Sequence, residues 1–101
     1  MDEWAGKTVL VTGAAGGMGK AVATRFLQNG ATVIASDINA SSLEKTAAKF
    51  SASGGNALAV VGDVSKVSDC KRIVSAATNE CGRLDSVINC AGVWVKALRM
   101  Q

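Results

Sequence analysis

A chain of 101 residues is long enough for one domain, and 49% hydrophobic with 19% charged residues is typical of a globular protein rather than a disordered one. The net charge of +3 is small and the basic residues are scattered, which is not the pattern of a nucleic-acid-binding protein. No apolar run reaches the roughly 18 residues of a membrane span, and the acidic start of the chain lacks a secretory signal. We therefore expect a cytoplasmic protein with neither a membrane nor a nucleic acid as its partner.

The sequence contains three cysteines but neither histidine nor tyrosine. Cys70, Cys81 and Cys90 are widely spaced and form no C-x-x-C pair, so we predict no metal site and expect the reduced thiols of a cytosolic protein. Cys90 is expected to behave as a small core residue. Because histidine, the commonest general acid–base side chain, is missing, we assign no catalytic residue in this sequence.

Short β-branched runs alternate with amphipathic segments from the start of the chain. Residues 7–12 predict a buried strand. The apolar side chains of residues 18–29 have the spacing of one helical face, and Gly30 is typical of a residue that ends a helix. Residues 31–36 predict a second strand.

The alternation continues into the middle of the chain. Ser41-Ser42-Leu43-Glu44 fits a capping box, in which the hydroxyl and the carboxylate bind N–H groups of the first turn. We therefore expect a helix to begin near Ser41 and to end at Gly54-Gly55. Residues 57–61 predict a third strand.

A last helix and strand complete the pattern. Ser65 is expected to cap a helix that runs to about Glu80 and ends at Gly82, and residues 85–89 predict a fourth strand. The element order is βαβαβαβ, and strands that are connected through helices run parallel. We predict an α/β fold that corresponds to the N-terminal half of a Rossmann-like doubly wound parallel sheet, with strand order 3-2-1-4. Residues 1–101 would form one partial dinucleotide-binding domain.

Glycines cluster in the segment TGAAGGMG, which follows the first strand and opens the first helix. A helix N-terminus attracts anions, and glycine lets a phosphate approach the backbone closely. The spacing Gly13-x-x-x-Gly17-x-Gly19 differs from the usual G-x-G-x-x-G, and no Lys-Ser/Thr pair follows as in a Walker loop. We interpret the segment as a phosphate-binding loop. The alternative is a turn whose glycines serve tight packing alone.

Asp37 follows the second strand, where a carboxylate can accept hydrogen bonds from an adenosine ribose and would repel a 2′-phosphate. This position favours NAD over NADP, although Lys20 and Arg25 remain available to a phosphate. The alternative is a turn aspartate that begins the next loop.

Two further strand ends carry candidate ligand-binding residues. Asp63-Val64 follows the third strand, where an adenine would lie; the alternative is a turn aspartate that caps the next helix in competition with Ser65. Residues 89–92, Asn-Cys-Ala-Gly, end the fourth strand, and their small side chains would keep the crevice beside the first strand open. A plain strand-ending turn is the alternative there.

These elements together resemble the classical branch of the short-chain dehydrogenase/reductase family. Residues 12–19 match its T-G-x-x-x-G-x-G, and Asp63-Val64 looks like its adenine-ring element. Residues 89–92 resemble its N-N-A-G, with Cys90 in place of the second Asn. The resemblance covers residues 6–100. It implies an NAD(P)-dependent oxidoreductase that interconverts an alcohol and a ketone by hydride transfer.

The resemblance also implies a cofactor site for NAD, with NADP less favoured. The glycines would shape the pyrophosphate loop, Asp37 would hold the ribose, and Asp63-Val64 would flank the adenine. Cys90 departs from the family pattern, and its thiol is a weak donor. The implied cofactor-binding residues are Gly13, Gly16, Gly17, Met18, Gly19, Asp37, Ile38, Asp63, Val64, Asn89, Ala91 and Gly92.

The family's catalytic Ser and its Tyr-x-x-x-Lys pair have no counterpart in these 101 residues. We therefore expect the chain to supply only the dinucleotide-binding part and to be inactive by itself. Its last residues would begin the helix after the fourth strand, which would leave that strand as an open edge and favour association, homo-oligomers included. The complete enzyme would act on a small alcohol or ketone.

Two alternative functions remain open from the sequence. The chain could be an NAD-binding or interaction module without catalysis. It could also belong to another class that uses an adenosine cofactor, such as S-adenosylmethionine, since that class also places acids after the second and third strands. The wide glycine spacing together with residues 89–92 argues against the latter.

Overall fold

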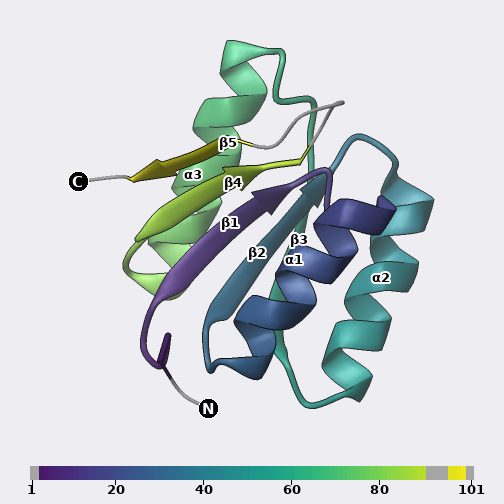
Figure 1. The fold of residues 1–101 in the computed structure, drawn as a ribbon. Helices are drawn as coiled ribbons and strands as arrows, with labels where there is room; N and C mark the ends of the chain where they lie inside the picture. Colours follow the sequence, from purple (N-terminus) through teal and green to yellow (C-terminus); the bar gives the residue numbers. More distant parts are fainter. Residues whose placement is uncertain (1–2, 91–95, 100–101) are drawn as a thin grey trace.

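The computed structural model describes residues 3–90 and 96–99 of the chain, which form a five-stranded sheet with helices on both faces (Figure 1). The elements in chain order are β1 (Thr8–Thr12), α1 (Gly17–Gln28), β2 (Thr32–Asp37), α2 (Ala40–Ala52), β3 (Asn56–Val61), α3 (Val67–Cys81), β4 (Ser86–Asn89) and β5 (Lys96–Arg99).

The first four strands are parallel and lie in the order β3-β2-β1-β4, which confirms the predicted topology. Strand β1 is central: Val9 is in register with Val33 of β2 on one side and with Ser86 of β4 on the other. All five residues of β1 are buried, as its continuous apolar run predicts for a strand with both faces covered. The carboxyl ends of these strands therefore meet at one edge of the sheet.

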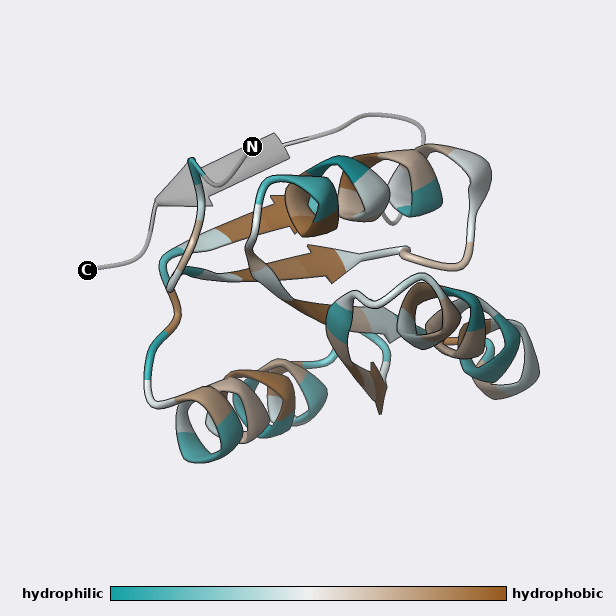
Figure 2. Cartoon of the chain, turned by 90° about the horizontal axis from the view of Figure 1, so that it is seen from below, coloured by the Kyte–Doolittle hydropathy of each residue, from teal (hydrophilic) through white to brown (hydrophobic). Residues whose placement is uncertain are grey.

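Alternate residues of the strands supply the cores of the two faces. On one face, residues such as Val9 and Val33 pack with Ala23 of α1 and Leu43 of α2. On the other face, Leu10 and its neighbours pack against α3. Figure 2 views these layers, and the strands between the helices are largely coloured as hydrophobic. Because successive side chains of a strand point to opposite faces, the strands contribute to two separate hydrophobic clusters, one on each face of the sheet.

The predicted caps of α2 and α3 were wrong. Asn39, not Ser41, caps α2, because the helix begins one residue earlier and the Asn39 side chain accepts a hydrogen bond from the Ser42 N–H at 3.1 Å. Ser65 does not cap α3, which begins at Val67. Its hydroxyl and its N–H instead donate hydrogen bonds to the Asp63 carboxylate.

The expectation that the chain ends in a helix was also wrong, because β5 pairs antiparallel with β4. Ser86 is in register with Arg99, and Asn89 with Lys96. Strand β4 is therefore an interior strand and not the predicted open edge. The physical reason is that the outer edge of β4 offers a row of N–H and C=O groups that a returning strand can pair with.

Candidate cofactor-binding site

A cavity of about 420 Å³ lies at the carboxyl ends of β1, β2 and β3. It brings together six of the predicted residues from three separate segments. The first turn of α1 follows directly after the rim of this cavity, and its residues Gly17, Met18 and Gly19 do not line it. Asn89 lines a neighbouring apolar cavity of about 260 Å³. The lining residues of the larger cavity are Thr12, Gly13, Gly16, Ser36, Asp37, Ile38, Gly62, Asp63, Val64, Ser65 and Cys90.

The glycine loop turns sharply at Gly13, whose φ of 67° is a left-handed conformation that glycine adopts without strain. The carbonyl of Gly13 accepts a hydrogen bond from the Gly16 N–H at 3.2 Å, which closes the loop. Helix α1 then begins at Gly17, and in the described part of the chain no side chain caps it. The N–H groups of this first turn, with the positive end of the helix dipole, are therefore available to an anion.

Asp37 joins two parts of the site. Its Oδ2 accepts a hydrogen bond from the Ala15 N–H of the glycine loop at 3.0 Å, and its Oδ1 accepts one from the Asn39 N–H at 3.0 Å. The turn role and the ligand role considered for this residue are compatible, because each carboxylate oxygen can accept a second hydrogen bond. The contact with Ala15 was not predictable from the sequence, since the two residues lie far apart along the chain.

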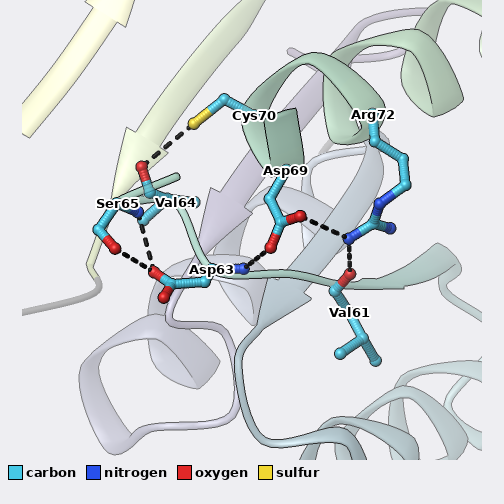
Figure 3. Close-up of polar contacts among 7 residues, drawn as sticks. All are labelled: Val61, Asp63, Val64, Ser65, Asp69, Cys70 and Arg72. Carbon is cyan, nitrogen blue, oxygen red and sulfur yellow. Dashed lines mark hydrogen bonds and ion pairs between the residues drawn. The ribbon is translucent and has the colours of Figure 1, made fainter. Parts of the chain in front are cut away.

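Asp63 forms a compact turn with Ser65 (Figure 3). Its Oδ1 accepts hydrogen bonds from the Ser65 N–H at 2.9 Å and from the Ser65 hydroxyl at 2.6 Å. These bonds, the side-chain bond foremost, lower the pKa of the Asp63 carboxyl. Its Oδ2 accepts no hydrogen bond from the residues that the structure describes, so this charged oxygen can receive a donor from a ligand.

The ends of β1 and β4 are tied to each other. The Thr12 hydroxyl donates a hydrogen bond to Asn89 Oδ1 at 2.7 Å, and the Cys90 N–H donates to the Thr12 carbonyl at 3.0 Å. Cys90 is buried within the core cluster, as predicted, and desolvation raises the pKa of its thiol. Ala91 and Gly92, the last two predicted residues, lie outside the described residues.

Sequence reasoning missed Ser36, which also lines the cavity. Ser36 is fully buried, and its Oγ is the one buried side-chain polar atom of residues 3–90 that has no hydrogen-bond partner. A buried hydroxyl without a partner is costly, so it marks a place where a ligand or a water is expected. The available signal was one polar residue near the end of an otherwise apolar strand.

The helices and acidic residues within the described ranges form neither of two other kinds of site. None of those helices combines the length and the apolar character that a membrane crossing requires. In the same ranges, no group of three or more His, Cys, Asp or Glu residues is placed to hold a metal ion.

The parallel sheet, with a glycine loop and two acids around one cavity, defines a Rossmann-like α/β domain. A family model described as "short chain dehydrogenase" matches residues 7–101, so the chain belongs to that family. This match confirms the resemblance seen in the glycine loop and the strand ends, and it argues against the S-adenosylmethionine alternative.

Similar proteins include curated oxidoreductases. The chain is 44% identical over 89 residues to the short chain dehydrogenase/reductase dpchG of Colletotrichum higginsianum. The matched segment covers 88% of this chain and 33% of that protein. It is 41% identical over 87 residues to a diacetyl reductase [(S)-acetoin forming] of Staphylococcus epidermidis. That match covers 86% of this chain and 34% of the relative. The chain thus spans about a third of the length of these relatives.

Solved structures show the same fold. A short chain dehydrogenase from Mycobacterium smegmatis superposes with a TM-score of 0.87 at 37% identity, covering 92% of this chain and 40% of that one. A short chain dehydrogenase/reductase from Burkholderia phymatum, solved in complex with NAD, superposes with a TM-score of 0.80 at 28% identity. That match covers 84% of this chain and 30% of the other.

Proposed function

We propose that the residues around the larger cavity and the first turn of α1 bind the adenosine diphosphate part of NAD. They would do so for an oxidoreductase that interconverts a small alcohol and a ketone. One observation carries this proposal: Asp37 and Asp63, from the ends of two neighbouring strands, line the same cavity as the loop that opens α1. Family membership and the NAD complex of the Burkholderia phymatum protein support it.

The phosphates would lie against the first turn of α1. A Cβ built at Gly17 would meet nothing within 4 Å, so this position has open space that a bound phosphate can use. The helix dipole and the N–H groups of this turn favour a negative charge there. We assign Gly13, Gly16, Gly17, Met18 and Gly19 to this part of the cofactor.

The adenosine would lie between the ends of β2 and β3. Asp37 would accept hydrogen bonds from the ribose hydroxyls, and its negative charge favours NAD over NADP. Asp63 Oδ2 would accept a hydrogen bond from the adenine amino group. The apolar side chains of Ile38, which is 68% exposed, and Val64 would cover the faces of the base.

The bound dinucleotide would supply the redox chemistry, because its nicotinamide accepts a hydride from an alcohol or donates one to a ketone. Our assignment for this chain is binding and orientation of the cofactor. Asn89, held by the Thr12 hydroxyl, would line the crevice together with Ala91 and Gly92. We assign proton transfer to residues outside these 101, because the sequence contains no tyrosine or histidine, and we expect no activity from the chain alone.

We further propose a cytoplasmic protein, supported by the free thiols of Cys70, Cys81 and Cys90. A homo-oligomer is our expectation for the complete enzyme, with neither a nucleic acid nor a membrane among its partners.

Calorimetric titration of the chain with NAD, ADP and nicotinamide mononucleotide tests the proposed function. We expect saturable binding of NAD and ADP at one shared site, with little binding of the mononucleotide, because it lacks the adenosine. Binding that depends on the nicotinamide end alone would contradict the proposal. Dehydrogenase turnover by the purified chain would contradict our assignment of proton transfer to other residues.

A further inference from the structure

The adenine side of the cavity is formed by a short turn, residues 62–65, between β3 and α3. Strand β3 lies at one edge of the sheet and, among the described strands, pairs with β2 alone. The last bond between them, from the Gly62 N–H to the Asp37 carbonyl, is 3.0 Å long. Beyond that bond the sheet no longer holds the turn, although Asp63 and Val64 line the cavity.

Helix α3 holds the turn by two side chains that lie one helical turn apart (Figure 3). Asp69 Oδ2 accepts a hydrogen bond from the Asp63 N–H at 2.9 Å. The Arg72 guanidinium donates to the Val61 carbonyl at 2.6 Å and lies 3.7 Å from Asp69 Oδ1. The two side chains therefore bind main-chain groups on both sides of Gly62 and also contact each other.

The backbone at Gly62 lies close to two side chains of α3, whose ends would have to shift to make room for a Cβ. A Cβ built there would lie 2.8 Å from Ile73 Cδ1 and 3.0 Å from the Arg72 guanidinium. Asp69 is in the first turn of α3, where the helix dipole favours its negative charge. This favourable position of the charge supports the hydrogen bond that Asp69 accepts from the Asp63 N–H.

The side chain of Asp63 takes no part in the contact with Asp69. Asp69 binds the main chain of Asp63, whereas Ser65 binds Oδ1 of the Asp63 carboxylate, and Oδ2 accepts no hydrogen bond from the described residues. We propose that Asp69, supported by Arg72, is a positioning residue that orients the 62–65 turn for the recognition of adenine. This inference rests on the proposed function.

The test compares the dissociation constants of NAD and of nicotinamide hypoxanthine dinucleotide, in which a carbonyl replaces the adenine amino group. The wild-type chain should prefer NAD, because a carboxylate oxygen accepts a hydrogen bond from an amino group and repels a carbonyl oxygen. Asp69→Ala should weaken NAD binding about tenfold, the effect typical of one lost hydrogen bond. It should weaken analogue binding much less, so that the preference is largely lost. Asp69→Asn, which keeps an acceptor for the Asp63 N–H, should retain most of it.

Glu80→Gln is the matched control, because Glu80 is an exposed acid at the opposite end of the same helix. It should leave both dissociation constants unchanged. If Asp69→Ala does not fold, Arg72→Met removes the bond to Val61 and should reduce the preference for NAD in the same direction.

A preference for NAD that stays at the wild-type value in the folded variants would overturn the positioning role, and so would a wild-type chain that binds both dinucleotides equally. A wild-type chain that binds neither dinucleotide would instead contradict the proposed function itself.

Discussion

Gly17 and Gly19 lie two residues apart in α1 but have different surroundings. A Cβ at Gly19 would overlap the carbonyl oxygen of Gly13, whereas a Cβ at Gly17 would meet nothing within 4 Å. The packing interpretation of the glycine loop therefore fits Gly19, whereas phosphate binding stays a prediction that concerns Gly17. Gly19 allows α1 to pack against the loop, and Gly17 leaves space in front of the first turn.

Substitutions at these two glycines should separate packing from binding. Gly19→Ala should lower the free energy of unfolding by about 1–3 kcal/mol, the usual cost of overpacking. Gly17→Val should change the free energy of unfolding by less than about 0.5 kcal/mol and abolish NAD binding, because its side chain occupies the open space. Urea denaturation and calorimetric titration measure the two effects. Equal destabilisation by both changes, or NAD binding retained by Gly17→Val, would contradict this division.

The charge of Asp37 should determine the choice between NAD and NADP. Asp37→Asn keeps an oxygen that can accept a backbone N–H but removes the charge that would repel a 2′-phosphate. The ratio of the dissociation constants for NADP and NAD should fall by at least roughly tenfold, given the strength of close like-charge repulsion near a protein surface. Parallel titrations with both dinucleotides measure the ratio. An unchanged ratio would remove Asp37 from the ribose site.

At the scale of elements, the three helices begin in different ways. Helix α2 is capped by the Asn39 side chain, whereas α1 and α3 have no side-chain cap in the described part of the chain. The uncapped N-terminus of α1 is the one that opens toward the proposed phosphate position. A cap there would occupy the N–H groups that an anion needs.

The cap of α2 can be tested by two neighbouring substitutions. Asn39→Ala should lower the free energy of unfolding by about 1 kcal/mol, because it removes the acceptor for the Ser42 N–H. Ser41→Ala should cost less than about 0.5 kcal/mol, because Ser41 is exposed and caps no N–H. Thermal unfolding of both variants provides the comparison. A larger loss from Ser41→Ala would restore the capping box that the sequence predicts.

At the scale of the whole molecule, Asp85 joins distant parts of the chain. Its Oδ2 accepts a hydrogen bond from the Thr8 N–H at 2.8 Å, and the Arg83 guanidinium binds both carboxylate oxygens, at 2.8 and 2.7 Å. The start of β4 is thereby tied to the start of β1. The hydrogen bond from Arg83, followed by that from Thr8, lowers the pKa of the Asp85 carboxyl.

This lowered pKa predicts a dependence of stability on pH. A carboxyl whose pKa is lower in the folded state contributes stability above its unfolded pKa, near 4, and loses that contribution as the pH falls through the folded value. Asp85→Asn should therefore be less stable than the wild type at neutral pH, and the difference should shrink as the pH falls below about 4. Urea denaturation at a series of pH values measures it. A difference that stays constant across that range would mean that the charge of Asp85 contributes nothing.

Much of the fold was predictable because it depends on patterns repeated along the chain. The β-branched runs and helical faces determine the elements, and helical connections require parallel neighbours, which together gave the order β3-β2-β1-β4. That the acids at positions 37 and 63 lie around one cavity was predictable for the same reason. Residues that directly follow parallel strands lie together, because the carboxyl ends of those strands are at the same edge of the sheet.

The sequence by itself thus determined the parallel sheet, the glycine loop and the edge at which the acids meet. Only the tertiary structure decided which polar group binds which: Asn39 rather than Ser41 at α2, Asp69 at the Asp63 N–H, and β5 beside β4. The physical reason is that periodic burial is encoded over many residues, whereas each N–H group has several nearby acceptors of similar strength. The choice among those acceptors depends on distances that only the packed chain fixes.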